Sequence, residues 1–257
     1  MNGMATQLGA LARRSVVRTL RQPGAIFPAI VFPLFFLAVI SAGAGSASKL
    51  PGFPTHSYFT FVLAGAFLQG IMLGGVNSGT DLATDVESGF LNRLALTPMR
   101  RIGVVAGQLT GMLAVSLIQI LTFLAVGFAF GARLQAGIGG AVVLVALGLV
   151  ISAAIGAVWS ALALRIGSSE AIQGAFPLAF VVLGFSSFFI PRALITVGWF
   201  KDVATWNPAS YLIEGMRSLW ITGWDGHALA VAFGLAAGIA ALGFVGAGAA
   251  LERRLSR

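Results

Sequence analysis

Six long runs without Asp, Glu, Lys or Arg constrain this chain more than any other feature. They extend from Gln22 to Ser48, Leu50 to Thr80, Ile102 to Ala132, Leu134 to Leu164, Ala171 to Pro191 and Gly226 to Leu251. Each run exceeds the roughly 20 residues with which a helix crosses about 30 Å of hydrocarbon. With 58% hydrophobic and 9% charged residues, the composition is that of a membrane protein. We therefore predict an all-α membrane protein, a single domain over residues 1–257 with six transmembrane helices.

The region between the fifth and sixth runs, residues 193–225, is too charged to cross a membrane. Lys201, Asp202, Glu214 and Arg217 leave only the apolar piece from residue 203 to residue 213. Such a piece is shorter than a spanning helix needs to be. We therefore predict a re-entrant or interfacial segment before the last span.

The basic residues predict the orientation. If both termini are cytoplasmic, the inner segments carry eleven basic residues, which are Arg13, Arg14, Arg18, Arg21, Arg93, Arg100, Arg101, Arg165, Arg253, Arg254 and Arg257. The outer segments then carry only Lys49, Arg133, Arg192, Lys201 and Arg217. This excess follows the positive-inside rule. The net charge of +8 therefore indicates topology and contact with anionic membrane lipid, with no need of nucleic acid as a partner.

Residues 5–22, before the first run, have the periodicity of an amphipathic helix. Leu8, Leu11 and Leu20 fall on one side, whereas Arg14 and Arg18 fall on another. We predict an interfacial helix along the cytoplasmic leaflet. The alternative is a plain basic flank of the first span with accidental periodicity.

The sequence contains no catalytic or metal-binding motif. It lacks the phosphate-binding GxxxxGK[ST] loop, a GxSxG elbow and an HExxH pair, so we predict no catalytic residue and no metal ligand in this chain. The interiors of the six spans also lack ionisable side chains, which proton- and ion-coupled carriers place near the middle of the membrane. Their amides and hydroxyls, such as Gln119, are expected to hydrogen-bond between helices, and glycine pairs such as Gly75 with Gly79 and Gly234 with Gly238 to allow close packing.

Residues 85–101, between the second and third runs, form a charged segment with helical periodicity. Asp85 and Glu87 are expected in the first turn of this helix and Arg100 and Arg101 at its far end, which suits a helix dipole. Pro98 predicts a stop near that end. By itself, this pattern fits two structures equally well. One is a helix that a soluble partner binds and moves, and the other is a loop with a helix that lies on the membrane surface.

Two short motifs and the order of the spans give the chain a family resemblance. The motifs are "ESGFLNRLALTPMRR" between spans two and three and "WNPASYLIEGMRSLW" over residues 206–220. The whole chain resembles the membrane subunit of ABC type-2 exporters, and within them the daunorubicin-resistance-like branch of drug and lipid exporters. The resemblance implies that residues 85–101 form a cytoplasmic coupling helix that docks on an ATPase subunit.

The resemblance also assigns roles to individual residues. It implies that the ATPase-coupling residues are Asp85, Glu87, Ser88, Gly89, Arg93, Leu94, Thr97 and Pro98. It implies that the outer re-entrant segment is shaped by Asn207, Pro208, Tyr211, Glu214 and Arg217. The three-residue spacing of Glu214 and Arg217 further predicts that these two side chains pair across one helical turn.

The function implied is that of an exporter subunit in a bacterial cytoplasmic membrane, with both termini inside. Two ATP-binding-cassette ATPase subunits would bind ATP and Mg, and a second copy of this chain or a related permease would complete the pathway. The spans, free of charge at mid-membrane, favour an amphipathic or hydrophobic cargo such as a drug, a lipid or a lipid-linked glycan. The alternatives are a carrier or channel that works without an ATPase, and a membrane-embedded enzyme.

Overall fold

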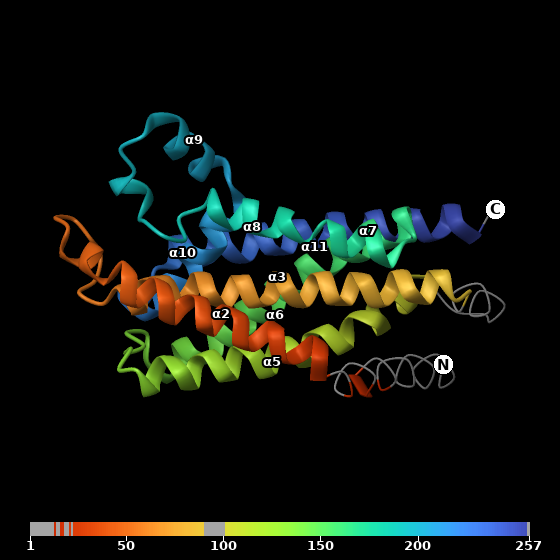
Figure 1. Cartoon of the computed structure of the whole chain (residues 1–257), viewed down its shortest axis with the longest axis horizontal. Coiled ribbons are helices and arrows are strands. Elements are labelled where there is room, and N and C mark those ends of the chain that lie inside the picture. Colours follow the sequence, from red (N-terminus) through yellow and green to blue (C-terminus); the bar gives the residue numbers. More distant parts are fainter. Residues whose placement is uncertain (1–12, 14–15, 18–20, 22, 90–100, 256–257) are drawn as a thin grey trace.

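The computed structural model describes residues 13, 16, 17, 21, 23–89 and 101–255. Five long helices dominate this part of the chain and run along one common direction (Figure 1): α2 (Pro23–Gly43), α3 (Tyr58–Glu87), α5 (Arg101–Ala129), α6 (Gly137–Ile166) and α11 (Gly226–Leu255). The shorter elements are η1 (Gly45–Lys49), α7 (Ser169–Gly174), α8 (Phe176–Gly184), η2 (Arg192–Leu194), α9 (Gly198–Trp206) and α10 (Pro208–Ile221). The described residues contain no strand, so the all-α prediction is confirmed.

Five of the six charge-free runs each form one helix that is long and apolar enough to cross a membrane. The run from Ala171 to Pro191 differs, because it forms two short helices that are interrupted at Ala175. Pro177 explains the interruption. Proline fits the first turn of α8, but it has no N–H to donate to the carbonyl of Gln173. The fifth span is therefore an interrupted helix.

Two predicted segments lie wholly or mainly outside the described residues. They are most of the interfacial helix of residues 5–22 and residues 90–100 of the charged segment, including Arg93, Leu94, Thr97 and Pro98.

The bundle itself has two ends that serve as landmarks in Figure 1. The α9 end carries η1 and the loop before α6, and the C-terminal end carries the end of α3, the turn between α6 and α7, and the end of α11.

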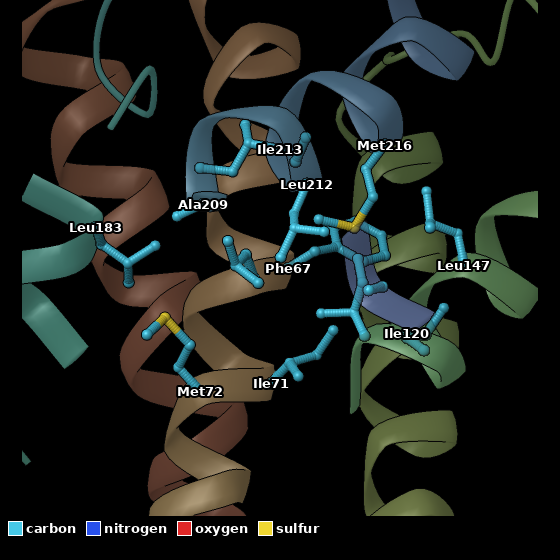
Figure 2. Packing of buried hydrophobic residues seen from close by; sticks show 14 of the residues in the cluster. Phe67, Ile71, Met72, Ile120, Leu147, Leu183, Ala209, Leu212, Ile213 and Met216 are labelled. Atoms are coloured by element: carbon cyan, nitrogen blue, oxygen red, sulfur yellow. The ribbon is translucent and has the colours of Figure 1, made fainter. Parts of the chain in front are cut away.

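Helix α3 occupies the centre of the bundle. It packs against α2, α5, α6, α7, α8 and α10. Of its most apolar stretch, 94% is buried inside the protein. Figure 2 shows side chains of α3 meeting those of four other helices, with Phe67, Ile71 and Met72 facing Ile120 of α5, Leu147 of α6, Leu183 of α8, and Leu212 and Met216 of α10. Because so many elements share α3 as a neighbour, its position sets theirs.

Glycines on α3 make this crowding possible. A Cβ atom at Gly75 would lie 2.6 Å from Cγ2 of Ile155 and 2.7 Å from Cδ1 of Trp159, both on α6. At Gly65 a Cβ atom would overlap the ring of Phe188. By contrast, nothing lies within 4 Å of a Cβ atom built at Gly234 on α11. The glycine spacing on α3 therefore reflects close packing within the described chain, whereas the pair on α11 does not.

A side-chain hydrogen bond pairs a backbone carbonyl that a proline leaves unpaired in α2. Pro33 lies inside α2 and has no N–H, so the carbonyl of Ala29, four residues earlier, loses its helical donor. Nε2 of Gln119, on α5, donates to that carbonyl at 2.6 Å. Gly70 of α3 leaves the room that this amide occupies, because a Cβ atom there would lie 2.8 Å from Nε2. The expected interhelical role of Gln119 is thereby confirmed.

The close packing of α3 against α6 predicts the effect of one methyl group. We expect Gly75→Ala to destabilise the protein by about 1–3 kcal/mol, because Ile155 and Trp159 must move to admit the new Cβ atom. Thermal unfolding of the purified protein in detergent measures the effect as a lower Tm. Gly234→Ala is the matched control and is expected to leave Tm unchanged. Equal Tm values for the two variants would contradict the packing described.

Candidate functional site

The segment of residues 193–225 lies at the α9 end and contains one exposed and one buried helix. In α9 the side chains of Trp199 and Trp206 are exposed, and α9 projects away from the bundle (Figure 1). In contrast, α10 packs inside the bundle against α11 and α3. Asn207 separates the two helices and caps α10, since its Oδ1 accepts from the N–H of Ala209 at 2.9 Å. Pro208 fits directly behind this cap as the first residue of α10.

Polar side chains of α10 hold the irregular backbone that follows α8. Nδ2 of Asn207 donates to the carbonyls of Val182 at 2.6 Å and Phe185 at 2.9 Å. The hydroxyl of Ser210 accepts from the N–H of Ser187 at 2.9 Å. Asn207, Ser210 and Arg217, with the backbone of residues 182–188, are named the carbonyl cluster. It fixes the end of the fifth span to α10.

Arg217 is the buried charge of the carbonyl cluster, with 6% of its surface exposed. Its Nε donates to the carbonyl of Phe61 at 3.0 Å, and its Nη2 donates to those of Ser187 at 2.8 Å and Phe188 at 3.3 Å. The guanidinium also lies 3.6 Å above the ring of Phe61. Carbonyl dipoles and an aromatic face therefore surround this cation, and they connect α10, α3 and the stretch after α8.

The predicted pairing of Glu214 with Arg217 is wrong. Glu214 instead accepts two hydrogen bonds from Arg192, from Nε at 2.8 Å and from Nη2 at 2.5 Å. The reason is burial: Arg217 points into the bundle, whereas the side chains of Glu214 and Arg192 keep 27% and 24% of their surface exposed. Burial lowers the pKa of Arg192, but the hydrogen bonds and charge of Glu214 outweigh it, so this pKa lies above its ordinary value.

Tyr211 completes the outer face of α10. Its ring lies under the guanidinium of Arg192, 4.4 Å from the ring centroid, and its hydroxyl donates to the carbonyl of Thr205 at 2.8 Å. The latter bond joins α10 to α9. The structure thus places Asn207 and Arg217 in the carbonyl cluster and Tyr211 and Glu214 around Arg192, whereas Pro208 is the first residue of α10. It adds Arg192 and Ser210, which sequence reasoning did not include in the site.

At the C-terminal end, those predicted coupling residues that the structure describes occupy a different element from the one expected. Asp85 and Glu87 belong to the last turn of α3, not to the first turn of a new helix. Ser88 is the C-cap of α3, and Gly89 follows with φ of +67°, a left-handed conformation that suits glycine. The expectation that Asp85 and Glu87 open a new helix was therefore wrong, because α3 continues seven residues beyond the charge-free run.

Glu87 contacts the beginning of α7. Its Oε1 accepts from the backbone N–H of Ser169 at 2.7 Å, and the hydroxyl of Ser169 lies 3.2 Å from Oε1 and 3.0 Å from Oε2. We name this pair of residues the α3–α7 link. A carboxylate at the C-terminal end of a helix is electrostatically unfavourable. The donors of Ser169 supply the compensation that α3 itself does not offer.

A second contact holds the turn between α6 and α7. Nε of Arg254, near the end of α11, donates to the carbonyl of Leu164, and the guanidinium lies against Gly167. Gly167 has φ of +70° and terminates α6. Ser168 then caps α7 by accepting from the N–H of Ala171. The sequence "IGSSE" at 166–170 contains both signals, a glycine that ends one helix and a serine that caps the next. This turn is not among the features predicted above from the sequence.

A cavity of about 510 Å³ lies beside the interruption of the fifth span. Its lining combines apolar and polar residues, which are Gly24, Val76, Asn77, Thr80, Asp81, Gln173 and Phe176. Gln173 is the residue whose carbonyl loses its helical donor at Pro177. Within the described part of the chain, no group of three His, Cys, Asp or Glu residues is placed to hold a metal ion.

Comparison with known proteins supports one family. The model of the ABC-2 type transporter family matches residues 6–221. The daunorubicin resistance ABC transporter permease protein DrrB1 of Streptomyces coeruleorubidus is 27% identical over 226 residues, which are 86% of this chain and 78% of that protein. The putative transport permease ycf38 of Porphyra purpurea is 26% identical over 222 residues, 85% of this chain and 76% of the relative. The family match covers most of the chain, including α10 and its buried Arg217. This chain therefore belongs to the ABC-2 type transporter family, as a transmembrane permease.

Proposed function

We propose that this chain is the membrane subunit of an exporter driven by two separate ATP-binding-cassette subunits. The observation that carries the proposal is the family match over residues 6–221 in a chain without a phosphate-binding loop of its own. ATP and Mg would be bound by the ATPase subunits. A second copy of this chain, or a related permease, would complete the pathway.

The proposed orientation follows from the basic residues. It places the C-terminal end of the bundle in the cytoplasm of a bacterial cell, where the last residue of α3 leads into residues 88–101. It places α9 and the carbonyl cluster on the outer side. Residues 88–101 would then dock on the ATPase, with Arg93, Leu94, Thr97 and Pro98 among the contacts.

The proposed cargo is an amphipathic or hydrophobic molecule. Irregular backbone within a membrane is tolerated where it is buried in protein or lines a cavity, and interrupted helices often border transported molecules. The cavity beside Ala175 fits this pattern, because the interruption of the fifth span forms part of its wall. Its Val76 and Phe176 suit an apolar body, whereas Asn77, Thr80 and Gln173 suit a hydrogen-bonding head group. DrrB1, by its name, belongs to a drug resistance system, which agrees with such a cargo.

The proposal predicts a partner. Purification of this subunit from its native membrane in mild detergent is expected to recover a stoichiometric nucleotide-binding protein with Mg-dependent ATPase activity. Export of the cargo from cells is expected to stop when ATP is depleted while the ion gradients are clamped. Export that continues under these conditions, with no ATPase recovered, would instead support a carrier or channel.

The orientation predicts a labelling pattern. The chain has no cysteine, so Ser88→Cys introduces a single thiol at an exposed position after α3. We expect a membrane-impermeant maleimide to label it only after the membrane is opened. Trp206→Cys, at a residue with 88% of its surface exposed on α9, is expected to react in intact cells. The reverse pattern would invert the topology.

The cavity predicts a selective loss of transport. We expect Gln173→Trp to lower the transport rate about tenfold, roughly 1.4 kcal/mol, because the indole occupies space that the cargo needs. The amount of protein in the membrane and its association with the ATPase should stay unchanged. Leu178→Trp is the control, since Leu178 lies on α8 with 62% of its surface exposed and outside the cavity. Equal transport by the two variants would remove this cavity from the pathway.

A further inference from the structure

We propose that Glu87 is a positioning residue that transmits movement of residues 88–101 to the interrupted fifth span through Ser169. The inference rests on the proposed exporter function and assigns to Glu87 an internal partner, in place of direct contact with the ATPase. Glu87 is the last residue of α3, so any displacement of the segment that follows it acts first on this turn.

The geometry of the α3–α7 link joins two distant parts of the chain. Glu87 and Ser169 are 82 positions apart, and both carboxylate oxygens of Glu87 lie within hydrogen-bonding distance of Ser169. Ser169 is the first residue of α7, and its own N-cap is already supplied by the hydroxyl of Ser168. Glu87 therefore does not replace a missing cap. It adds a connection between helices.

The link lets α7 shift together with Glu87 at little cost to the stability of the bundle. All its hydrogen bonds are exposed, and exposed bonds of this kind contribute little to the stability of a fold. The carbonyl cluster at the other end of the same span is buried. Movement transmitted to the fifth span therefore meets less resistance at Ser169 than at Ser187.

Helix α7 can carry the displacement to the cavity because it is short. Gln173, one turn after Ser169, lines the cavity, and Phe176 lines it just beyond the interruption at Ala175. Arg254 holds Leu164 and Gly167 on the other side of the turn, so the α6 end of the connection is fixed to α11. A pull on Ser169 would thus rotate α7 about Gly167 and change the cavity wall.

Ser169→Pro tests the link at its donor. Proline removes both the N–H and the hydroxyl, yet it is favoured at the first position of a helix. The preceding Ser168 has φ of −126° and ψ of 124°, the extended conformation that a following proline requires. In the assembled complex in proteoliposomes, we expect ATP hydrolysis to continue and cargo moved per ATP to fall about fivefold or more, as for ordinary coupling between sites.

Matched variants separate transmission from a merely structural role. Glu87→Ala removes both acceptor oxygens and is expected to lower cargo per ATP in the same way, whereas Glu170→Ala, at the next position of α7, should behave like the unmodified chain. Glu87→Gln keeps one acceptor oxygen for Ser169 and is expected to retain part of the coupling. Membrane amount and Tm should be equal in all variants, because the exposed link contributes little to folding. Should Ser169→Pro fail to accumulate, Glu87→Ala against Glu170→Ala still decides the question.

A double variant distinguishes the two possible partners of Glu87. If Glu87 acts through Ser169, Glu87→Ala combined with Ser169→Pro is no worse than either change alone. If the two losses multiply, or if Ser169→Pro has normal coupling while Glu87→Ala does not, Glu87 acts elsewhere and the inference is overturned. A complex without ATP-driven transport in the unmodified chain would refute the proposed function itself, and the inference with it.

Discussion

The structure depends on one constraint, that lipid offers no hydrogen-bond partner to a backbone group that a helix leaves unpaired. One proline and one irregular stretch bring this constraint into view. Pro33 frees the carbonyl of Ala29, and Gln119 pairs it. Beyond α8 the backbone leaves helical geometry, and Asn207 and Arg217 donate to the carbonyls that result. In both places a side chain from another part of the chain donates the hydrogen bond that the local backbone cannot supply. The need to pair these carbonyls therefore also determines which helices lie together.

The two ends of the bundle satisfy this constraint with different strength. At the α9 end, a buried guanidinium bonds to carbonyls from two parts of the chain and lies over an aromatic ring. At the C-terminal end, the connections through Glu87 and Arg254 are exposed or only partly buried. In the transport cycle proposed above, a span held firmly at one end and loosely at the other would move at the loosely held end. Between the two lies the interruption at Ala175, which is where a bend can be absorbed.

Much of this architecture could be predicted from the sequence, because hydrocarbon thickness converts charge-free length directly into helices. Length and charge do not predict the interruption of the fifth span, although Gly174 and Pro177 mark it in the sequence. The partners of charged residues could not be predicted in the same way. Spacing along α10 suggested Arg217 for Glu214, but burial directs the two side chains apart, and burial depends on elements distant in sequence. Likewise, nothing local to Glu87 indicates Ser169.

The pairing of Gln119 with the carbonyl of Ala29 has a consequence for how such chains can diverge. A lineage that first replaced Pro33 would regain the helical N–H, and Gln119 would then be free to become an ordinary apolar residue. A lineage that lost Gln119 first would carry an unpaired carbonyl inside the bundle, which is costly. The two positions therefore have a preferred order of change, and an ancestral chain can be expected to have acquired the amide before, or together with, the proline.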